Sequence, residues 1–246
     1  MNDRHAPLDA HALTPIGVIE SDFPDKFGIP RQPGLASTAR ASLVLVPPFD
    51  DPLTVRGLEA FSHLWLTFIF HASPLRWTPL VRPPRLGGNA RVGVFASRST
   101  HRPNRLGLSL VELAGLDTTR GVRLHLRGAD LVDGTPVLDI KPYLPWAEAR
   151  PDARAGFAPD PPPTLGVCYA PAAAATLDAH PDGAALRALI DEVLAQDPRP
   201  AYRRGGEARL YGVRLRDVDV RFQARLDATG ATQLAVVEIV PATAAT

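Results

Sequence analysis

Prolines constrain this chain more than any other residue type, because they divide it into short segments. The sequence has 26 prolines in 246 residues, about double the usual frequency of about 5%. Many stand in Pro-Pro, Arg-Pro-Pro or Asp-Pro steps, which interrupt helices and strands and favour loops. We therefore expect short elements joined by proline-rich turns, with scarcely a helical pattern over residues 14–146.

Short apolar or alternating runs lie between these turns. Alternation with a period of two indicates a half-buried strand, and a nearly continuous apolar run indicates a strand buried on both faces. The runs are Ile16–Glu20, Arg40–Val46, Ser62–His71, Val92–Ala96, Leu106–Leu116, Val122–Arg127 and Val137–Tyr143. Their density predicts a mainly β fold whose N-terminal part is a closed or nearly closed barrel of about seven strands.

A different pattern follows a Pro-, Ala- and Asp-rich linker at residues 147–164. Apolar residues recur at helical spacing over residues 184–196, which predicts an amphipathic helix beginning near Asp182. The runs 209–226 and 233–240 predict strands joined as in a hairpin. We therefore expect a flexible leader at 1–13, a barrel domain at 14–146, the linker, and a small α+β domain at 165–246.

Composition and missing motifs exclude several classes of protein. The 27 basic residues balance 26 acidic ones, so any anion-binding surface must come from local clustering. A single cysteine, Cys168, excludes an internal disulfide and a cysteine-based zinc site, and the seven histidines show no metal-binding spacing. The sequence lacks GxGxxG, GxxxxGK[ST] and GxSxG motifs. Without a secretory segment or a long apolar run, we expect a cytoplasmic protein with no membrane contact.

The stretch Gly87–Ser109 (GGNARVGVFASRSTHRPNRLGLS) concentrates the candidate ligand chemistry. An apolar run leads into a proline-broken turn that carries Arg98, His101, Arg102 and Arg105. Small residues around it let the backbone approach a ligand closely. Arginines in such turns, with aromatic residues nearby, favour contacts with phosphates and bases. The stretch therefore predicts a site for an anionic or adenosine-bearing ligand, with a plain surface loop as the alternative.

Five blocks of the chain resemble the TrmO family. They are PRQPGL (30–35), VRGLEAFSHLW (55–65), RPPRLGGNARVGVFASRSTHRPNRLGLS (82–109), DLVDGTPVLDIKPYLPW (130–146) and AQDPRPAYR (195–203). The resemblance is collinear over nearly the whole chain. It implies a β-barrel methyltransferase, usually a homodimer, that uses S-adenosyl-L-methionine to methylate N6 of the threonylcarbamoyl-adenosine just 3′ of a tRNA anticodon.

The resemblance also implies site residues. Those implied for the cofactor are Gln32, Pro33, Gly34, His71, Ala72, Arg98, Leu108, Asp130, Val132, Asp133 and Gly134. Those expected to contact tRNA are Arg102, Arg105, Lys141, Tyr143, Arg199 and Tyr202. The chain departs from the family pattern at Arg105, where many members have proline, and at Ala72, which is less polar than in some members.

No obvious general base occurs in these blocks, and the carbamoyl substituent should make the N6 proton more acidic than in plain adenosine. We therefore expect catalysis mainly by positioning, with no single indispensable base. Two alternatives remain open at this stage. One is a non-catalytic barrel that binds RNA or a nucleotide, and the other is a methyltransferase for a different adenosine or a small molecule.

Overall fold

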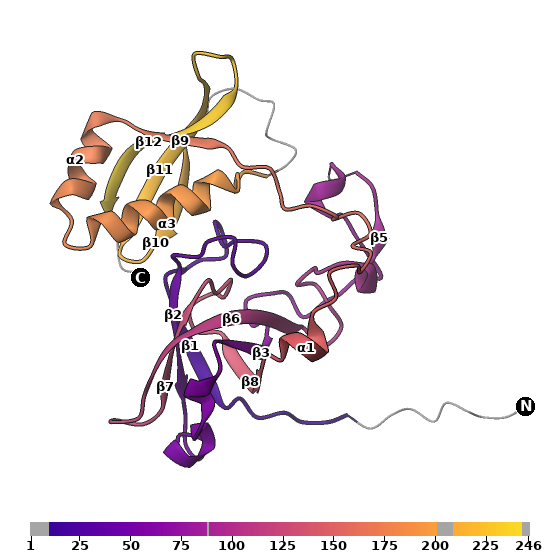
Figure 1. The fold of residues 1–246 in the computed structure, drawn as a ribbon. Coiled ribbons are helices and arrows are strands. Elements are labelled where there is room, and N and C mark those ends of the chain that lie inside the picture. Colours follow the sequence, from indigo (N-terminus) through magenta and orange to yellow (C-terminus); the bar gives the residue numbers. More distant parts are fainter. Residues whose placement is uncertain (1–9, 88, 201–208, 243–246) are drawn as a thin grey trace, which may run out of the picture.

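Six strands within the described residues close into an antiparallel barrel. The computed structural model describes residues 10–87, 89–200 and 209–242, so most of the expected leader lies outside it. The barrel order is β1-β2-β7-β6-β3-β8 (Figure 1). The strands are β1 (Gly17–Ser21), β2 (Arg40–Leu45), β3 (His63–Ile69), β6 (Leu106–Asp117), β7 (Arg123–Arg127) and β8 (Pro136–Pro142).

Alternation along these strands fills the barrel interior with branched aliphatic side chains. Leu43 on β2, Leu64 and Leu66 on β3, and Leu124 on β7 are completely buried, and their neighbours along each strand face outward. Burying one such side chain contributes about 1.5–3 kcal/mol. The barrel therefore has its own apolar core.

The mainly β fold class is confirmed, but the barrel has six strands rather than about seven. The run Val92–Ala96 gives only the two-residue strand β5 (Val92–Gly93), which pairs with β4 (Leu80–Val81) outside the barrel. The rest of the run forms the 3₁₀ turn η4 (Val94–Ala96), in which Val94 is buried and Phe95 is 76% exposed. A run with one buried residue gives too little apolar surface to enter the barrel wall.

The second domain is a sheet covered by two helices. In the described residues the sheet order is β10-β11-β12-β9, with β9 parallel to β12 and the other pairs antiparallel. Helices α2 and α3 pack on the sheet (Figure 1). The elements are β9 (Gly166–Tyr169), α2 (Pro171–Ala179), α3 (Gly183–Ala195), β10 (Tyr211–Leu215), β11 (Val218–Leu226) and β12 (Thr232–Pro241).

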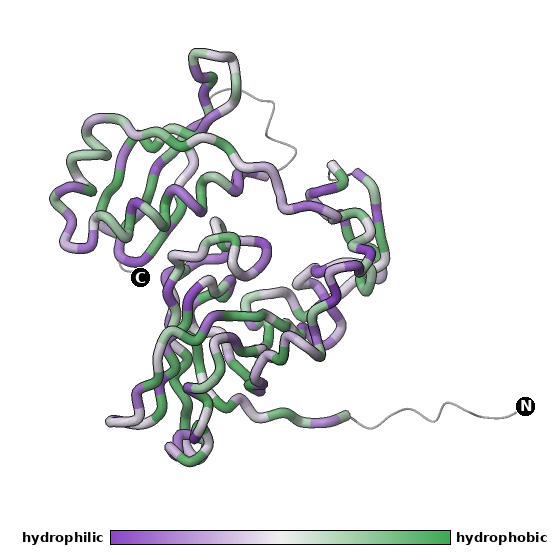
Figure 2. The backbone as a smooth tube through the Cα atoms, viewed as in Figure 1, coloured by the Kyte–Doolittle hydropathy of each residue, from purple (hydrophilic) through white to green (hydrophobic). Residues whose placement is uncertain are grey.

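Short helical turns connect these parts. They are η1 (Pro52–Val55), η2 (Leu58–Ala60), η3 (Pro84–Leu86) and α1 (Pro145–Glu148). No helix within the described ranges is long and apolar enough to cross a bilayer. In Figure 2, hydrophobic stretches lie along the strands and helices of both domains, with hydrophilic residues between them.

One loop of the barrel belongs to the core of the second domain. Residues 22–39 connect β1 to β2, and Phe23, Ala36 and Ala39 are buried in the same cluster as Leu186 of α3 and Val213 of β10. The two domains are therefore joined by a shared core as well as by the linker.

Candidate functional site at one rim of the barrel

Three connections between described barrel strands reach the same rim. They are the loop at residues 22–39, the segment at residues 70–105 between β3 and β6, and the turn at residues 128–135 between β7 and β8. In an antiparallel barrel alternate connections lie at the same end. The pairs Ile69–Leu106, Ser21–Ala41 and Arg40–Arg127 place all three connections there.

Hydrogen bonds join the three connections. Gly34 N donates to the carbonyl oxygen of Gly128 at 2.9 Å, and Asp133 N donates to that of Phe23 at 2.9 Å. Lys26 Nζ donates to the carbonyl oxygen of Ala72 at 2.7 Å. The segments that contain Gln32–Gly34, His71–Ala72 and Asp130–Gly134 are thus neighbours, although they are far apart in the sequence.

The turn 130–134 is held by hydrogen bonds from Ser21, the last residue of β1. Ser21 N donates to Asp133 Oδ1 at 2.9 Å, and Ser21 Oγ donates to the carbonyl oxygen of Leu131 at 2.8 Å. Gly134 has a φ of +75°, which favours glycine. A Cβ at this position would lie 4.0 Å from His71 Nε2. The imidazole therefore lies beside the turn, in which Val132 is half-buried.

Arg98, Leu108 and Asp130 form the other part of the rim. Arg98 Nη2 donates to the carbonyl oxygen of Leu108 at 3.3 Å, and Ser109 Oγ donates to Asp130 Oδ1 at 2.6 Å. Burial raises the pKa of the Asp130 carboxyl, while the Ser109 hydrogen bond and the Arg98 charge oppose this shift. The Leu108 side chain is 48% exposed. Cationic, acidic and apolar groups therefore lie close together at this part of the rim.

The residues expected to contact tRNA do not form one group. Arg102 and Arg105 lie in the segment at the rim just described, and the Arg102 guanidinium lies 5.9 Å from the centre of the Phe95 ring. Lys141 and Tyr143 are at the far end of β8, where Tyr143 N donates to the carbonyl oxygen of His63. No hydrogen bond or ring contact among the described residues joins these two pairs.

Arg199 is an interior residue rather than a surface contact. Its side chain is 5% exposed, and its Nε donates to Asp197 Oδ1 at 2.7 Å. A buried guanidinium that is paired with a carboxylate is not free to bind a phosphate on the surface. Tyr202 lies outside the described residues.

Arg105 has a backbone conformation that excludes proline. Its φ is +51°, in the left-handed region, whereas a proline ring holds φ near about −65°. The turn before β6 therefore cannot have the backbone of a relative that carries proline at this position. Arg105 N nevertheless closes the turn by donating to the carbonyl oxygen of Arg102 at 3.1 Å.

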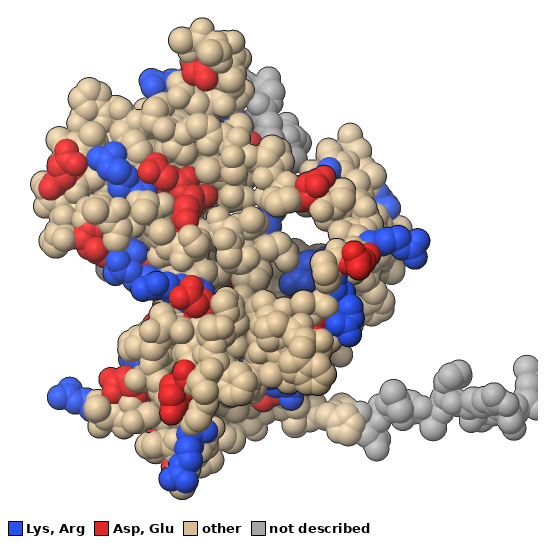
Figure 3. Space-filling view, viewed as in Figure 1, with Lys and Arg blue, Asp and Glu red and all other residues tan. Residues whose placement is uncertain are grey.

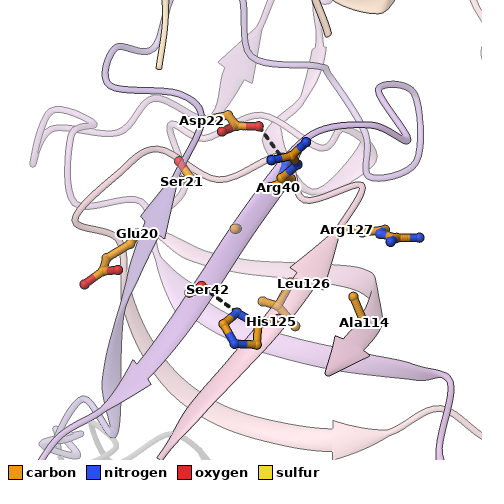
Figure 4. Close-up of a pocket in the computed structure, with 10 residues that line it drawn as sticks. Glu20, Ser21, Asp22, Arg40, Ser42, Ala114, His125, Leu126 and Arg127 are labelled. Atoms are coloured by element: carbon orange, nitrogen blue, oxygen red, sulfur yellow. Dashed lines mark hydrogen bonds between the residues drawn. The ribbon is translucent and has the colours of Figure 1, made fainter. Parts of the chain in front are cut away.

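A separate shallow pocket of about 440 Å³ lies on the outer wall of the barrel (Figure 4). Ser42 Oγ and His125 Nδ1 are hydrogen-bonded there at 3.2 Å. Asp22 Oδ2 accepts a hydrogen bond from Arg40 N at 2.8 Å. Its lining mixes acidic residues with Arg40 and Arg127, and it includes none of the residues expected at the site. We therefore place the candidate site at the rim.

Sequence reasoning missed some residues that shape the rim, including Lys26, Ser109 and Gly128. Ser109 and Gly128 have a visible signal, because a small polar residue follows Leu108 and a glycine precedes the acidic turn. Lys26 has none, since its contact with Ala72 is long-range. Among the described residues, no three His, Cys, Asp or Glu side chains are grouped so that they could hold a metal ion.

The fold and the rim define a two-domain β-barrel protein whose site is built from loops at strand ends, a class distinct from the Rossmann and P-loop folds. Residues 18–149 match the family model of the tRNA-methyltransferase O N-terminal domain, and residues 162–242 match that of the TrmO C-terminal domain. The chain therefore belongs to the TrmO family, which confirms the resemblance seen in the sequence.

Individual relatives agree with this assignment. A putative S-adenosylmethionine-dependent methyltransferase of Pseudomonas aeruginosa is 53% identical over 218 residues, which cover 86% of this chain and 92% of the relative. A tRNA (adenine(37)-N6)-methyltransferase of Escherichia coli is 52% identical over 213 residues, which cover 85% and 91%. A crystal structure of TrmO from Pseudomonas aeruginosa has a TM-score of 0.76 at 44% identity, and the match covers 95% of this chain and 100% of that one.

Proposed function

We propose that this protein is a S-adenosyl-L-methionine-dependent tRNA methyltransferase that methylates N6 of threonylcarbamoyl-adenosine at position 37. The observation that carries the proposal is the convergence of three separate connections on one rim, in a chain that is 52% identical to a tRNA (adenine(37)-N6)-methyltransferase. The threonylcarbamoyl group is the finer part of the proposal and rests on the family resemblance.

The groups at the rim fit S-adenosyl-L-methionine chemically. The cofactor carries a carboxylate, an ammonium group, ribose hydroxyls and an adenine ring. Arg98 offers a cation, Asp130 and Asp133 offer carboxylates, and Leu108 offers an exposed apolar surface. At Gly34 a Cβ would meet nothing within 4 Å, so the space beside this backbone is open. We propose that Gln32, Pro33, His71, Ala72, Val132 and Gly134 complete the site.

The cofactor supplies an electrophilic methyl group on its sulfonium. The protein's task is to hold N6 of the acceptor in line with the carbon–sulfur bond, about 3–3.5 Å from the methyl carbon, and to exclude water. When bound, the cofactor would supply the methyl group to N6 and leave as the neutral thioether S-adenosylhomocysteine, and the N6 proton would pass to solvent. We propose that positioning supplies most of the catalysis. A substitution scan that found one side chain essential for turnover, with both ligands still bound, would contradict this.

For tRNA contacts we propose Arg102 and Arg105 beside the cofactor site, with Lys141 and Tyr143 as a second surface and Tyr202 as a further contact. Figure 3 shows an opening through this face of the molecule, with Lys and Arg side chains at its edge. Arginine and lysine neutralise phosphates, so tRNA affinity should fall with rising salt. A binding isotherm measured at several salt concentrations would test this.

We also propose a homodimer that acts in the cytoplasm, where tRNA is modified. Leu75, Trp77, Leu80 and Phe95 on the segment at 70–105 are exposed. Exposed apolar side chains that are close in the chain are typical of interfaces. Light scattering of the purified protein measures its mass in solution, and a monomer at all concentrations would contradict the dimer.

The test of the reaction is mass spectrometry of threonylcarbamoylated tRNA after incubation with the protein and S-adenosyl-L-methionine. We expect the modified nucleoside to gain the mass of one methyl group, and an unmodified transcript to gain none. Methylation of both tRNAs would contradict the specificity for the carbamoyl group. Cofactor binding without any methylation would point to another acceptor, and RNA binding without cofactor binding would point to a non-catalytic barrel.

A further inference from the structure

A glutamate of the second domain holds the loop that carries Gln32–Gly34. Glu192, on α3, accepts hydrogen bonds from Ser37 Oγ at 2.7 Å and from Thr38 N at 2.9 Å, and Thr38 Oγ1 donates to its Oε2 as well. Hydrogen bonds to an ionised acceptor are about twice as strong as those between neutral groups. The carboxylate therefore fixes the end of the loop that follows Gly34.

An ion pair holds the other end of the loop. Arg216, in the turn between β10 and β11, donates from Nε to Asp22 Oδ1 at 2.9 Å and from Nη2 to Asp22 Oδ2 at 3.2 Å. The two side chains are 13% and 11% exposed. Arg216 N also donates to the carbonyl oxygen of Asp22 at 2.9 Å. Side chain and backbone of one arginine thus bind the first residue of the loop.

The middle of the loop packs closely on the same domain. Gly28 has a φ of +93°, and a Cβ there would lie 2.3 Å from Val213 Cγ2. Phe23 and Ala36, on either side of the tip, are buried in the core of the second domain. Towards the barrel, the tip is tied by the hydrogen bond from Gly34 N to the carbonyl oxygen of Gly128.

We propose that Glu192 and Arg216 are positioning residues that order the cofactor loop, so that affinity for S-adenosyl-L-methionine depends on the second domain. This rests on the proposed function, in which Gln32–Gly34 binds the cofactor. Ordering a free loop costs conformational entropy at every residue. A loop that is already ordered before the cofactor arrives avoids this cost during binding.

The experiment measures affinity for S-adenosyl-L-methionine by calorimetry on the full chain without tRNA. The variant Glu192→Gln keeps the shape of the side chain but replaces one acceptor oxygen with a donor. We expect binding to weaken by about tenfold, because charge-assisted hydrogen bonds to the loop are lost. Affinity equal to that of the wild type would overturn the inference.

Asp191→Asn is the matched control. It makes the same carboxylate-to-amide change one position earlier on α3. The Asp191 carboxylate accepts a hydrogen bond from the Tyr169 hydroxyl at 2.6 Å, within the second domain. We expect its cofactor affinity to remain within about twofold of the wild type. An equal loss in both variants would mean that general loosening of the domain, rather than the loop contact, lowers affinity, and would overturn the inference.

A double-mutant cycle tests whether the effect passes through the loop. Ser37→Ala with Thr38→Val removes the hydroxyl donors while keeping the side chains small or similarly branched. If Glu192 acts through these donors, adding Glu192→Gln to this background should lower affinity much less than it does in the wild type. Fully additive losses would overturn the inference.

The affinity of the wild-type protein for S-adenosyl-L-methionine is measured first, because it distinguishes failure of the proposed function from failure of this inference. Wild type that binds no S-adenosyl-L-methionine overturns the proposed function and this inference together. Wild type that binds, with a Glu192→Gln variant that binds equally well, overturns this inference alone. A Glu192→Gln variant with normal cofactor affinity and weakened tRNA affinity would instead assign this face of the second domain to the nucleic acid.

Discussion

The two long connections of the barrel, the loop at 22–39 and the segment at 70–105, both supply residues to the rim, but they are stabilised differently. The loop at residues 22–39 has buried side chains at Phe23, Ala36 and Ala39 and is bound by Glu192. In its described residues, 70–87 and 89–105, the other segment has two strands of two residues each and short 3₁₀ turns. Several of its large apolar side chains are exposed.

This difference separates two tasks within one site. The loop at 22–39 is held in place by the second domain without any ligand, so in its proposed role it would bind the cofactor without a further cost of ordering. The segment at 70–105 has little apolar core of its own, and regions with few buried contacts open at low energetic cost. We expect it to respond to what binds there, whether tRNA or a second copy of the chain.

The largest effect should come from breaking the ion pair at the base of the loop. Asp22→Ala removes the buried carboxylate that pairs with the Arg216 guanidinium. Only the ion pair with the more exposed Asp182 then remains. Removing one partner of a buried pair costs roughly 3–5 kcal/mol. Urea unfolding measures the decrease in the free energy of unfolding. The control is Asp178→Ala, whose exposed pair with Arg187 should contribute less than about 1 kcal/mol. Equal losses would mean that the loop is not anchored at this point.

Substitution of one glycine in each segment compares how tightly the loop at 22–39 and the segment at 70–105 are packed. Gly28→Ala should cost roughly 2–3 kcal/mol, because a left-handed backbone and a close contact with Val213 both oppose a Cβ. Gly87→Ala, with a φ of +70° and open space around it, should cost only about 1 kcal/mol. Thermal or urea unfolding of both variants measures the difference. A cost at Gly87 as large as that at Gly28 would show that the segment at 70–105 is packed as tightly as the loop.

Asp130 lies beside Ser109 and within the electrostatic influence of Arg98 on the segment at 70–105, and its effect should depend on pH. Because burial raises the pKa of this carboxyl in the folded state, the folded protein holds the proton more tightly than the unfolded chain does. Its contribution to stability is then fully present below the ordinary pKa of about 3.9 and is lost as pH rises through the raised value.

Asp130→Asn should therefore be at least as stable as the wild type at neutral pH, and this advantage should shrink towards low pH. Cofactor affinity should fall by about tenfold, since a charged contact with the ligand is lost. Denaturation at several pH values and calorimetry measure the two effects. A variant that is less stable at neutral pH would contradict the direction of the shift, and unchanged affinity would remove Asp130 from the site.

The smallest effect on stability should be that of Phe95→Ala. The ring is exposed, and its contact with the Arg102 guanidinium at 5.9 Å contributes about 0.5–1 kcal/mol at most. Unfolding should be nearly unchanged, while methylation of tRNA or dimer formation should fall. A large change in unfolding, with methylation and dimer formation both intact, would make Phe95 a structural residue. The segment at 70–105 would then not be less tightly packed than the loop at 22–39.

Local patterns were sufficient to predict most of the barrel and the helix α3. Period-two alternation identified β2 and β7, because each strand has one face in the core, and an apolar run identified β6. Patterns failed where few residues are buried. Helix α2 is rich in alanine and buries only Ala173 and Leu177, so its sequence has hardly any apolar face. The run 209–226 hides a tight turn at Arg216, whose φ of +53° a non-glycine residue seldom adopts.

The cofactor residues came from the family resemblance, and the structure brings their segments together. The support behind them could not be predicted. Ser37, Thr38 and Glu192 meet across more than 150 residues of sequence, and nothing in the local sequence of either segment marks the contact. The burial of Arg199 was missed for the same reason, since an arginine in a proline-rich stretch is indistinguishable by sequence from a surface arginine.

The loop at 22–39 packs in one core with the C-terminal sheet, so it depends on residues that are synthesised much later. Asp22 and Arg216 are 194 positions apart. A ribosome that adds about 5–20 residues per second leaves the loop waiting for roughly 10–40 seconds before its partners emerge. The barrel strands are complete well before then. On the proposed role of Gln32–Gly34, affinity for the cofactor is therefore acquired near the end of synthesis, and a chain that stops early has its barrel strands but lacks the support for this loop.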